Sequence, residues 1–234
     1  SDPRYHAYVQ ILKEELIPAM GCTEPIALAY AGAVARRTLG ELPDRVTVQA
    51  SGSIIKNVKS VIVPNTDHLK GIDAAVSAGI VAGDPDKKLE VIASVTPEQI
   101  QAMKQFMDEV PIEIEHIDKG CTFDIVVIVH HKDEYAKVRI ANYHTNIVLI
   151  EKNGEILEQA KVSGDSEDGL TDRNLLDMEH IWDFAMTVEI DEVKALLDQQ
   201  ISCNMTIADE GLKNDYGANI GKVLLAMDGD NVRV

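Results

Sequence analysis

Residues 123–130 read FDIVVIVH, an almost unbroken apolar run with the length of one β-strand. A short apolar run of this kind is typical of a strand buried on both faces, so we expect it near the centre of a sheet. Further strands are predicted at residues 45–50, 58–63, 112–117 and 136–141, and a hairpin at 145–157 that turns at Asn153-Gly154. The middle of the chain is therefore expected to be β-rich.

Helical patterns flank this middle on both sides. A helix is predicted over residues 4–17, and a second, Ala-rich helix is expected to carry Pro25 at its first position and to stop at Gly40. The other predicted helices are residues 71–81, 97–109, 175–187 and 188–199, the last continuing toward 207. The fold class is predicted as α+β, with a mixed sheet packed with helices and a helical C-terminal segment.

A polar, acidic break at residues 163–172 suggests the domain boundary. We expect residues 1–165 to form an α+β substrate-side domain and residues 166–234 to form a helical segment. The many apolar and small residues at helical positions make a homodimer a reasonable expectation.

Charge limits the classes of partner. The 234-residue chain has a net charge of −17, and residues 151–200 alone hold 14 acidic and 4 basic side chains. Phosphate backbones and anionic membranes would be repelled, so neither nucleic acid nor a membrane is an expected partner. No apolar stretch reaches the ~18 residues of a membrane span, and residues 1–5 lack a signal-peptide layout, which favours a cytoplasmic location. Three widely separated cysteines also favour a reducing compartment.

The first candidate for chemistry is the stretch Gly21-Cys22-Thr23-Glu24-Pro25, placed just before a predicted helix. The positive end of the helix dipole would lower the pKa of the Cys22 thiol, and the N–H groups of the first turn could hold a carboxylate. A buried, unreactive cysteine is the competing interpretation, because free cysteine is among the most buried residue types.

The second candidate is the polar stretch from Ser51 to Asn57, which follows a predicted strand and is expected to be a loop. Its hydroxyl, amide and ammonium groups could bind a carboxylate, with Lys56 as a counter-charge or a base. An ordinary polar turn explains the same residues, and on residue types alone that interpretation is favoured.

The third candidate is His144, which is expected at a junction between two strands beside Thr145. An imidazole in this setting could transfer protons, or it could satisfy the backbone of a turn. The glycine-spaced tail, with Gly211, Gly217 and Gly221, is predicted to serve close helix packing.

Three segments together resemble a known family. The stretches ELIPAMGCTEP (15–25), SGSIIKNV (51–58) and HTNI (144–147) resemble, in the same order, the iron–sulfur L-cysteine desulfidases, relatives of the bacterial iron–sulfur L-serine dehydratases of the α-chain-like type. The resemblance runs from the first predicted helix to Gly221.

This resemblance implies β-elimination of a small amino acid. L-cysteine would give pyruvate, ammonia and sulfide, and L-serine would give pyruvate and ammonia, with a [4Fe–4S] cluster acting as a Lewis acid. Cys22 would be the base or a thiol facing the substrate. The resemblance also implies a set of substrate-binding residues: Thr23, Glu24, Ser51, Ser53, Lys56, Asn57, His144 and Thr145.

The chain departs from that family in length and in its cysteines. Members are longer and hold their cluster mainly through cysteines of a C-terminal half, whereas Cys22, Cys121 and Cys203 lie on different predicted elements without clustered spacing. We therefore expect an N-terminal portion that has no complete cluster site and is inactive alone.

Two other functions remain open at this stage. A non-catalytic amino-acid-binding module could keep the pocket without the chemistry. A cofactor-independent racemase could use Cys22 and Cys121 on opposite sides of one α-carbon, but the Gly-Cys-Thr-Glu element comes late in such racemases and early here.

Overall fold

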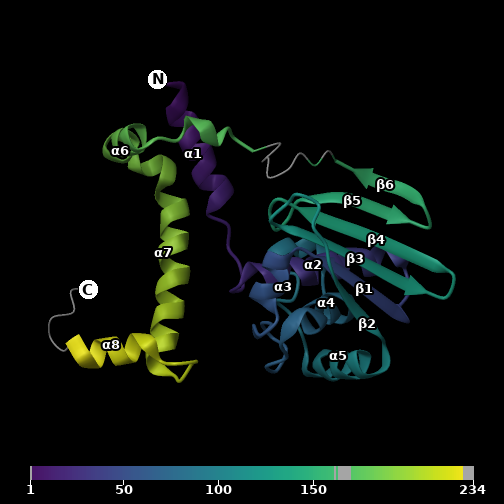
Figure 1. Ribbon diagram of the computed structural model, residues 1–234. Helices are drawn as coiled ribbons and strands as arrows, with labels where there is room; N and C mark the ends of the chain where they lie inside the picture. The colour runs from purple at the N-terminus through teal and green to yellow at the C-terminus, as the bar shows by residue number, and fades with distance from the viewer. Residues whose placement is uncertain (1, 161, 163–169, 229–234) are drawn as a thin grey trace. The chain divides into compact units, whose positions relative to one another are not determined.

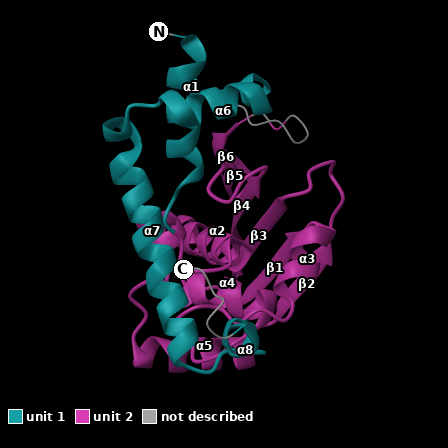
Figure 2. Cartoon of the chain, turned by 90° about the vertical axis from the view of Figure 1, so that its left-hand side faces the viewer, with its two compact units in different colours: residues 1–18, 170–234 teal, residues 19–169 magenta. Residues whose placement is uncertain are grey.

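The computed structural model describes residues 2–160, 162 and 170–228. The chain forms two compact units (Figures 1 and 2). Unit 1 comprises residues 1–18 and 170–234, and unit 2 comprises residues 19–169.

Unit 2 is built on a six-stranded sheet in the order β2-β1-β3-β4-β5-β6. The strands are β1 (Arg45–Ala50), β2 (Ile112–His116), β3 (Asp124–His131), β4 (Glu134–Ala141), β5 (Ile147–Lys152) and β6 (Glu155–Gln159). β1 and β2 are parallel, and the other neighbours are antiparallel, so the sheet is mixed as expected. The apolar run of residues 123–130 forms the interior strand β3, which confirms its predicted central place.

An ion pair is buried within this sheet. The Asp124 side chain is 1% exposed and accepts two hydrogen bonds from Arg139 on β4, at 2.9 and 2.8 Å. This two-pronged geometry satisfies a carboxylate that burial would otherwise leave without its hydration. The pair joins β3 to β4 on the face of the sheet opposite the core residues Ile125 and Val138.

The helices of unit 2 are α2 (Thr23–Leu39), α3 (Gly52–Val58), α4 (Gly71–Ala82) and α5 (Pro97–Glu109), with a 3₁₀ turn at Pro85–Glu90. Twelve of the 17 residues of α2 are buried. α2 packs against β3 and β4 and against α4, and α4 packs in turn against α5. The predicted α+β class, with helices on a mixed sheet, is confirmed.

Glycines set the close approach of α2 and α4. A Cβ atom at Gly79 would lie 1.8 Å from the carbonyl oxygen of Ala29, and one at Gly32 would lie 2.8 Å from that of Val76. Both distances are too short for any other residue unless the helices separate. The prediction of close packing at the tail glycines is wrong for Gly211 and Gly217, since a Cβ there would meet no described atom within 4 Å.

Residues 51–63 differ from the prediction of a loop followed by a strand. Gly52–Val58 form α3, with Ser51 as its N-cap residue, and Ile62 makes only an isolated bridge to Lys70. The buried side chains Ile54 and Val58 are four residues apart, which is helical spacing. A seven-residue helix is too short to produce a clear period in the sequence, so the apolar residues at 58–63 suggested a strand instead.

Unit 1 joins the first helix to the C-terminal helices. Its elements are α1 (Pro3–Glu15), a 3₁₀ turn (Arg173–Leu175), α6 (Met178–Thr187), α7 (Ile190–Lys213) and α8 (Ile220–Asp228). The structure groups residues 1–18 with residues 170–234, whereas the sequence suggested one domain of residues 1–165.

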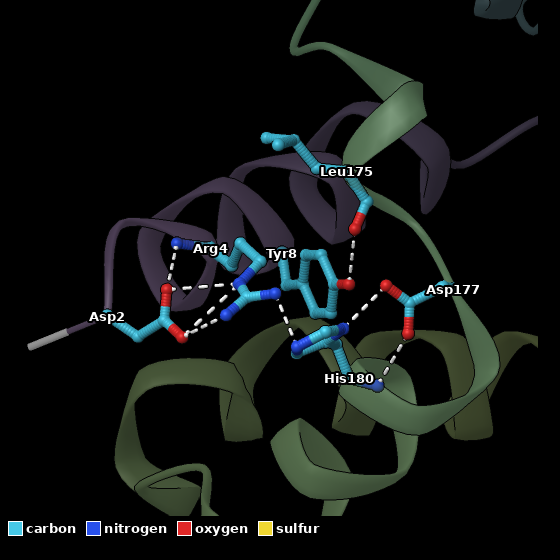
Figure 3. Close-up of polar contacts among 6 residues, drawn as sticks. All are labelled: Asp2, Arg4, Tyr8, Leu175, Asp177 and His180. Atoms are coloured by element: carbon cyan, nitrogen blue, oxygen red, sulfur yellow. Dashed lines mark hydrogen bonds and ion pairs between the residues drawn. The ribbon is translucent and has the colours of Figure 1, made fainter.

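Polar contacts explain this grouping (Figure 3). Arg4 bonds both Asp2 and His180, and the His180 ring is held from its other side by Asp177. The Tyr8 hydroxyl donates to the Leu175 carbonyl at 2.6 Å. Arg173 forms an ion pair with Glu14 near the end of α1. The contacts between α1 and the C-terminal segment join residues 159–176 positions apart, so no local pattern reveals them.

Not one helix of the described ranges combines the length and the apolar character needed to cross a membrane.

Candidate functional site

The start of α2 places three candidate residues at one corner of unit 2. Gly21 has a φ of +116°, a conformation that other residues rarely adopt, and it turns the chain into the helix. The helix begins at Thr23, so Cys22 is itself the N-cap residue, and Pro25 does not hold the first position as predicted. Among the described residues, no side-chain hydrogen bond caps this end, so the first turn can present N–H groups to an anion.

Cys22 and Glu24 form a hydrogen-bonded pair. The Cys22 thiol donates to Oε2 of Glu24 at 3.0 Å. Partial burial of the thiol, and then this bond, raise the pKa of Cys22 above its ordinary value of 9.0. The expected lowering of the Cys22 pKa is therefore wrong, because burial of the thiol and then the neighbouring carboxylate both raise it. The same bond lowers the pKa of Glu24, which stays ionised at neutral pH.

His144 also lies at this corner, although it is 121 residues from Thr23 in the sequence. It lies between β4 and β5, as predicted, and its Nε2 is 2.8 Å from the Thr23 hydroxyl. The ring is half-buried and packs against Phe123, with 4.5 Å between ring centroids. Burial lowers the pKa of His144 below its ordinary value of 6.5, although the charge of Glu24 opposes this. The imidazole is thus neutral at pH 7.

The loop that carries His144 is held by its own hydrogen bonds. The Asn142 N–H donates to the Phe123 carbonyl at 3.0 Å, and the Asn146 amide donates to the Ala141 carbonyl at 2.9 Å. Asn142 has a φ of +75°, which asparagine tolerates better than most residues. These contacts fix the imidazole relative to the sheet.

Of the predicted residues on α3, Asn57 joins the corner. Its side chain lies near Glu24 and is the smallest of the influences that lower the pKa of that carboxyl. Ser51, also predicted to bind substrate, is buried, and its hydroxyl donates to the Thr122 carbonyl at 2.7 Å. Ser53 and Lys56 are exposed on the same short helix.

Thr145 faces a different space. It lines an open cavity of about 410 Å³ together with Tyr30 and Asn146, and neither Cys22 nor Glu24 lines that cavity. Thr145 lies in the loop between β4 and β5, as predicted. The cavity that it lines is separate from the corner that holds Cys22 and Glu24.

Two residues near the candidate site were missed from the sequence. Phe123 packs on His144, and His116 at the end of β2 lies against Gly52, where a Cβ atom would be 3.3 Å from its Nε2. Nothing in their local sequence signals these positions, because both depend on how the strands are ordered in the sheet.

The cysteines do not provide a cluster site. Cys121 is buried in unit 2, whereas Cys203 is exposed on α7 of unit 1. Across the described ranges, no three His, Cys, Asp or Glu side chains are grouped to hold a metal ion. The described residues therefore do not gather the ligands of a [4Fe–4S] cluster. The burial of Cys121 also argues against a racemase, in which both thiols must reach one ligand.

Comparison with known proteins finds close relatives under a single name. A UPF0597 protein of Desulfitobacterium hafniense is 52% identical over 236 residues, covering 100% of this chain and 54% of the relative. UPF0597 proteins of Lachnoclostridium phytofermentans and Treponema denticola are 42% and 41% identical, over 98% and 95% of this chain and 55% and 52% of the relatives. No family model matches the chain, and no solved structure matches it significantly.

These relatives correct the family expected from the sequence. Their matches cover 95–100% of this chain, and they are named UPF0597 proteins, not desulfidases or serine dehydratases. The resemblance to an N-terminal portion of the iron–sulfur family is therefore wrong as an assignment. The chain spans about half the length of the curated relatives it matches, and it is similar to UPF0597 proteins over that half.

Proposed function

We propose that the corner formed by Cys22, Glu24, Asn57 and His144 binds a small α-amino acid and acts in its β-elimination. The substrate would be L-cysteine, giving pyruvate, ammonia and sulfide, or L-serine, giving pyruvate and ammonia. The observation that carries the proposal is the Thr23–His144 hydrogen bond, which brings a neutral imidazole to a thiol–carboxylate pair 121 residues away in sequence.

The charges of the corner complement an amino-acid zwitterion. Glu24 is ionised and can receive the ammonium group of the ligand. The first turn of α2 can receive the carboxylate through N–H groups. The Cα atom of the ligand would then lie between Glu24 and His144.

The same residues can move the protons of an elimination. His144 takes the α-proton through Nδ1, the nitrogen opposite its bond to Thr23, and the released electron pair forms the Cα–Cβ double bond. The bond from Cβ to sulfur or oxygen breaks, and the leaving group takes the proton of the Cys22 thiol. Return of the proton from His144 to Cys22 restores both groups. The aminoacrylate product then hydrolyses to pyruvate and ammonia. No step is routed through a metal cluster.

Binding without turnover is the second candidate, favoured by one observation. Cys22 stays protonated beside Glu24, so it is not the base that the resemblance implied, and removal of the α-proton would depend on His144 alone. A binding module needs only the zwitterion contacts and not the proton transfers. Turnover separates the two functions.

The test is pyruvate formation from L-cysteine and L-serine by the complete reading frame that encodes this chain, expressed and assayed without oxygen. We expect Cys22→Ser and His144→Gln each to lower kcat at least about 100-fold, in the range of a lost general acid or base. Cys203→Ser on α7 and His68→Asn on an exposed turn are the matched controls and should change kcat less than about twofold.

The outcomes separate the candidates. Pyruvate formation that survives both Cys22→Ser and His144→Gln contradicts the elimination mechanism. Saturable amino-acid binding without pyruvate supports the binding module. A cytoplasmic location and a homodimer remain predictions that the same preparation can address by cell fractionation and by light scattering.

A further inference from the structure

Large apolar side chains of unit 1 face solvent along α7. Ile190, Ile201, Met205 and Leu212 are 70%, 59%, 52% and 43% exposed, and they are separated by steps that bring them to one side of an α-helix. We call these four residues the α7 stripe. α8 has the same character, since Ile220 and Met227 lie seven residues apart and are both exposed.

This exposure is unusual for a folded protein. A surface helix normally buries its apolar stripe, yet Val193 is the one buried residue among the 24 of α7. In the described part of unit 1, the buried hydrophobic residues are Tyr8, Val9, Ile11 and Val193. Extended apolar surfaces of this kind mark interaction sites.

The relatives suggest what covers the stripe. The UPF0597 proteins of D. hafniense and L. phytofermentans match nearly all of this chain with only 54% and 55% of their own lengths. Each therefore carries a comparable length of further polypeptide. The exposed apolar faces of α7 and α8 are surfaces on which this further polypeptide could pack.

Charge argues against the other occupants. Residues 170–228 hold twelve acidic and four basic side chains. A second copy of this surface would bring like charges together, and an anionic membrane would be repelled. A partner with an apolar face and basic flanks fits better.

We propose that the α7 stripe is the docking surface for the further polypeptide carried by proteins of the length of these relatives, which contributes apolar helix faces flanked by basic side chains. Unit 1 is then the shared half of a larger helical core. This interface is independent of the amino-acid site in unit 2.

Hydrogen exchange provides the test. The 234-residue chain and the complete reading frame are compared peptide by peptide over residues 178–227. Backbone amides of α7 and α8 should exchange at least about 100-fold more slowly in the complete protein. Equal exchange in both proteins overturns the proposal, as does a reading frame that adds no polypeptide or protection of α7 in a homodimer of the 234-residue chain.

A double variant makes the test specific to the stripe. Ile201→Glu/Met205→Glu should abolish the added protection in the complete protein and leave the melting temperature of the 234-residue chain unchanged. Ile156→Glu, at an exposed position of β6 in unit 2, is the matched control and should leave the protection intact. Protection that survives the double variant means that the further polypeptide docks elsewhere and overturns the proposal.

Discussion

The helices α4 and α7 show opposite uses of apolar residues. Nine of the 12 residues of α4 are buried, and its glycines and alanines let it approach the α2 backbone closely. α7 is twice as long and carries larger apolar side chains, yet just one of its 24 residues, Val193, is buried. Small side chains permit close approach within unit 2, whereas the large apolar side chains of α7 in unit 1 are exposed. Substitutions in unit 1 and in unit 2 test this difference.

The largest effect is expected at Gly79. Gly79→Ala would place a methyl group 1.8 Å from the Ala29 carbonyl oxygen, so α2 and α4 must separate, and we expect a loss of about 3 kcal/mol or more in the free energy of unfolding. Gly211→Ala is the control on α7, where a Cβ meets no described atom within 4 Å, and it should be neutral or stabilise by up to about 1 kcal/mol. Urea denaturation measures both. Equal effects at the two glycines would contradict the contrast.

The next effect is expected at the buried ion pair. Arg139→Met leaves the Asp124 carboxylate buried without its partner and should cost about 3–5 kcal/mol. Arg37→Met removes an exposed pair with Asp86 and should cost about 1 kcal/mol or less. Urea denaturation followed by circular dichroism distinguishes the two. A small effect at Arg139 would mean that the pair is hydrated.

A smaller, pH-dependent effect is expected in unit 1. Hydrogen bonding to Arg173, and then to Thr171, lowers the pKa of Glu14 below its ordinary value of 4.5. A lowered carboxyl pKa stabilises the fold above the unfolded value, and that stability is lost as the pH falls through the folded pKa. Glu14→Gln should therefore destabilise unit 1 by about 1.5–3 kcal/mol at pH 7 and have little effect at pH 2.

Trp182, the chain's one tryptophan, reports this change because it lies on α6 of unit 1. Urea denaturation of the wild-type chain and of Glu14→Gln, followed by Trp182 fluorescence at pH 7 and pH 2, gives the comparison. A difference that persists undiminished at pH 2 would exclude the ion pair as its source.

The smallest effect is expected on the α7 stripe. Ile201→Ala in the 234-residue chain removes side-chain atoms that are already 59% exposed and should change the free energy of unfolding by less than about 0.5 kcal/mol. Leu28→Ala, in the fully buried interior of α2, should cost about 2–5 kcal/mol. A large effect of Ile201→Ala would show that the 234-residue chain already buries the stripe.

Elements with local signals were predictable from the sequence. α5 matches its prediction at both ends because Thr96 and Gln99 form a capping box and Pro97 begins the helix. The hairpin of β5 and β6 turns at Asn153-Gly154, where both residues have the positive φ that this pair favours. The short helix α3 had no comparable signal.

The candidate site was only partly predictable. The residue types at Cys22, Glu24 and His144 pointed to proton chemistry, but their meeting depends on a contact across 121 residues. The direction of the Cys22 pKa was predicted wrongly because the helix dipole was considered without the burial of the thiol and the carboxylate two residues away. Similarly, the ion pair between Glu14 and Arg173 joins segments that are distant in the sequence. It links residues 1–18 to residues 170–234, a grouping that the sequence did not indicate.

The most direct test of the central claim is binding of L-serine and L-cysteine to the 234-residue chain, followed by NMR. The account predicts saturable shifts at Cys22, Glu24 and His144, with the dissociation constant raised about tenfold or more by Glu24→Gln and unchanged by Glu41→Gln on an exposed turn. The absence of saturable shifts, or equal binding by both variants, would contradict the amino-acid site.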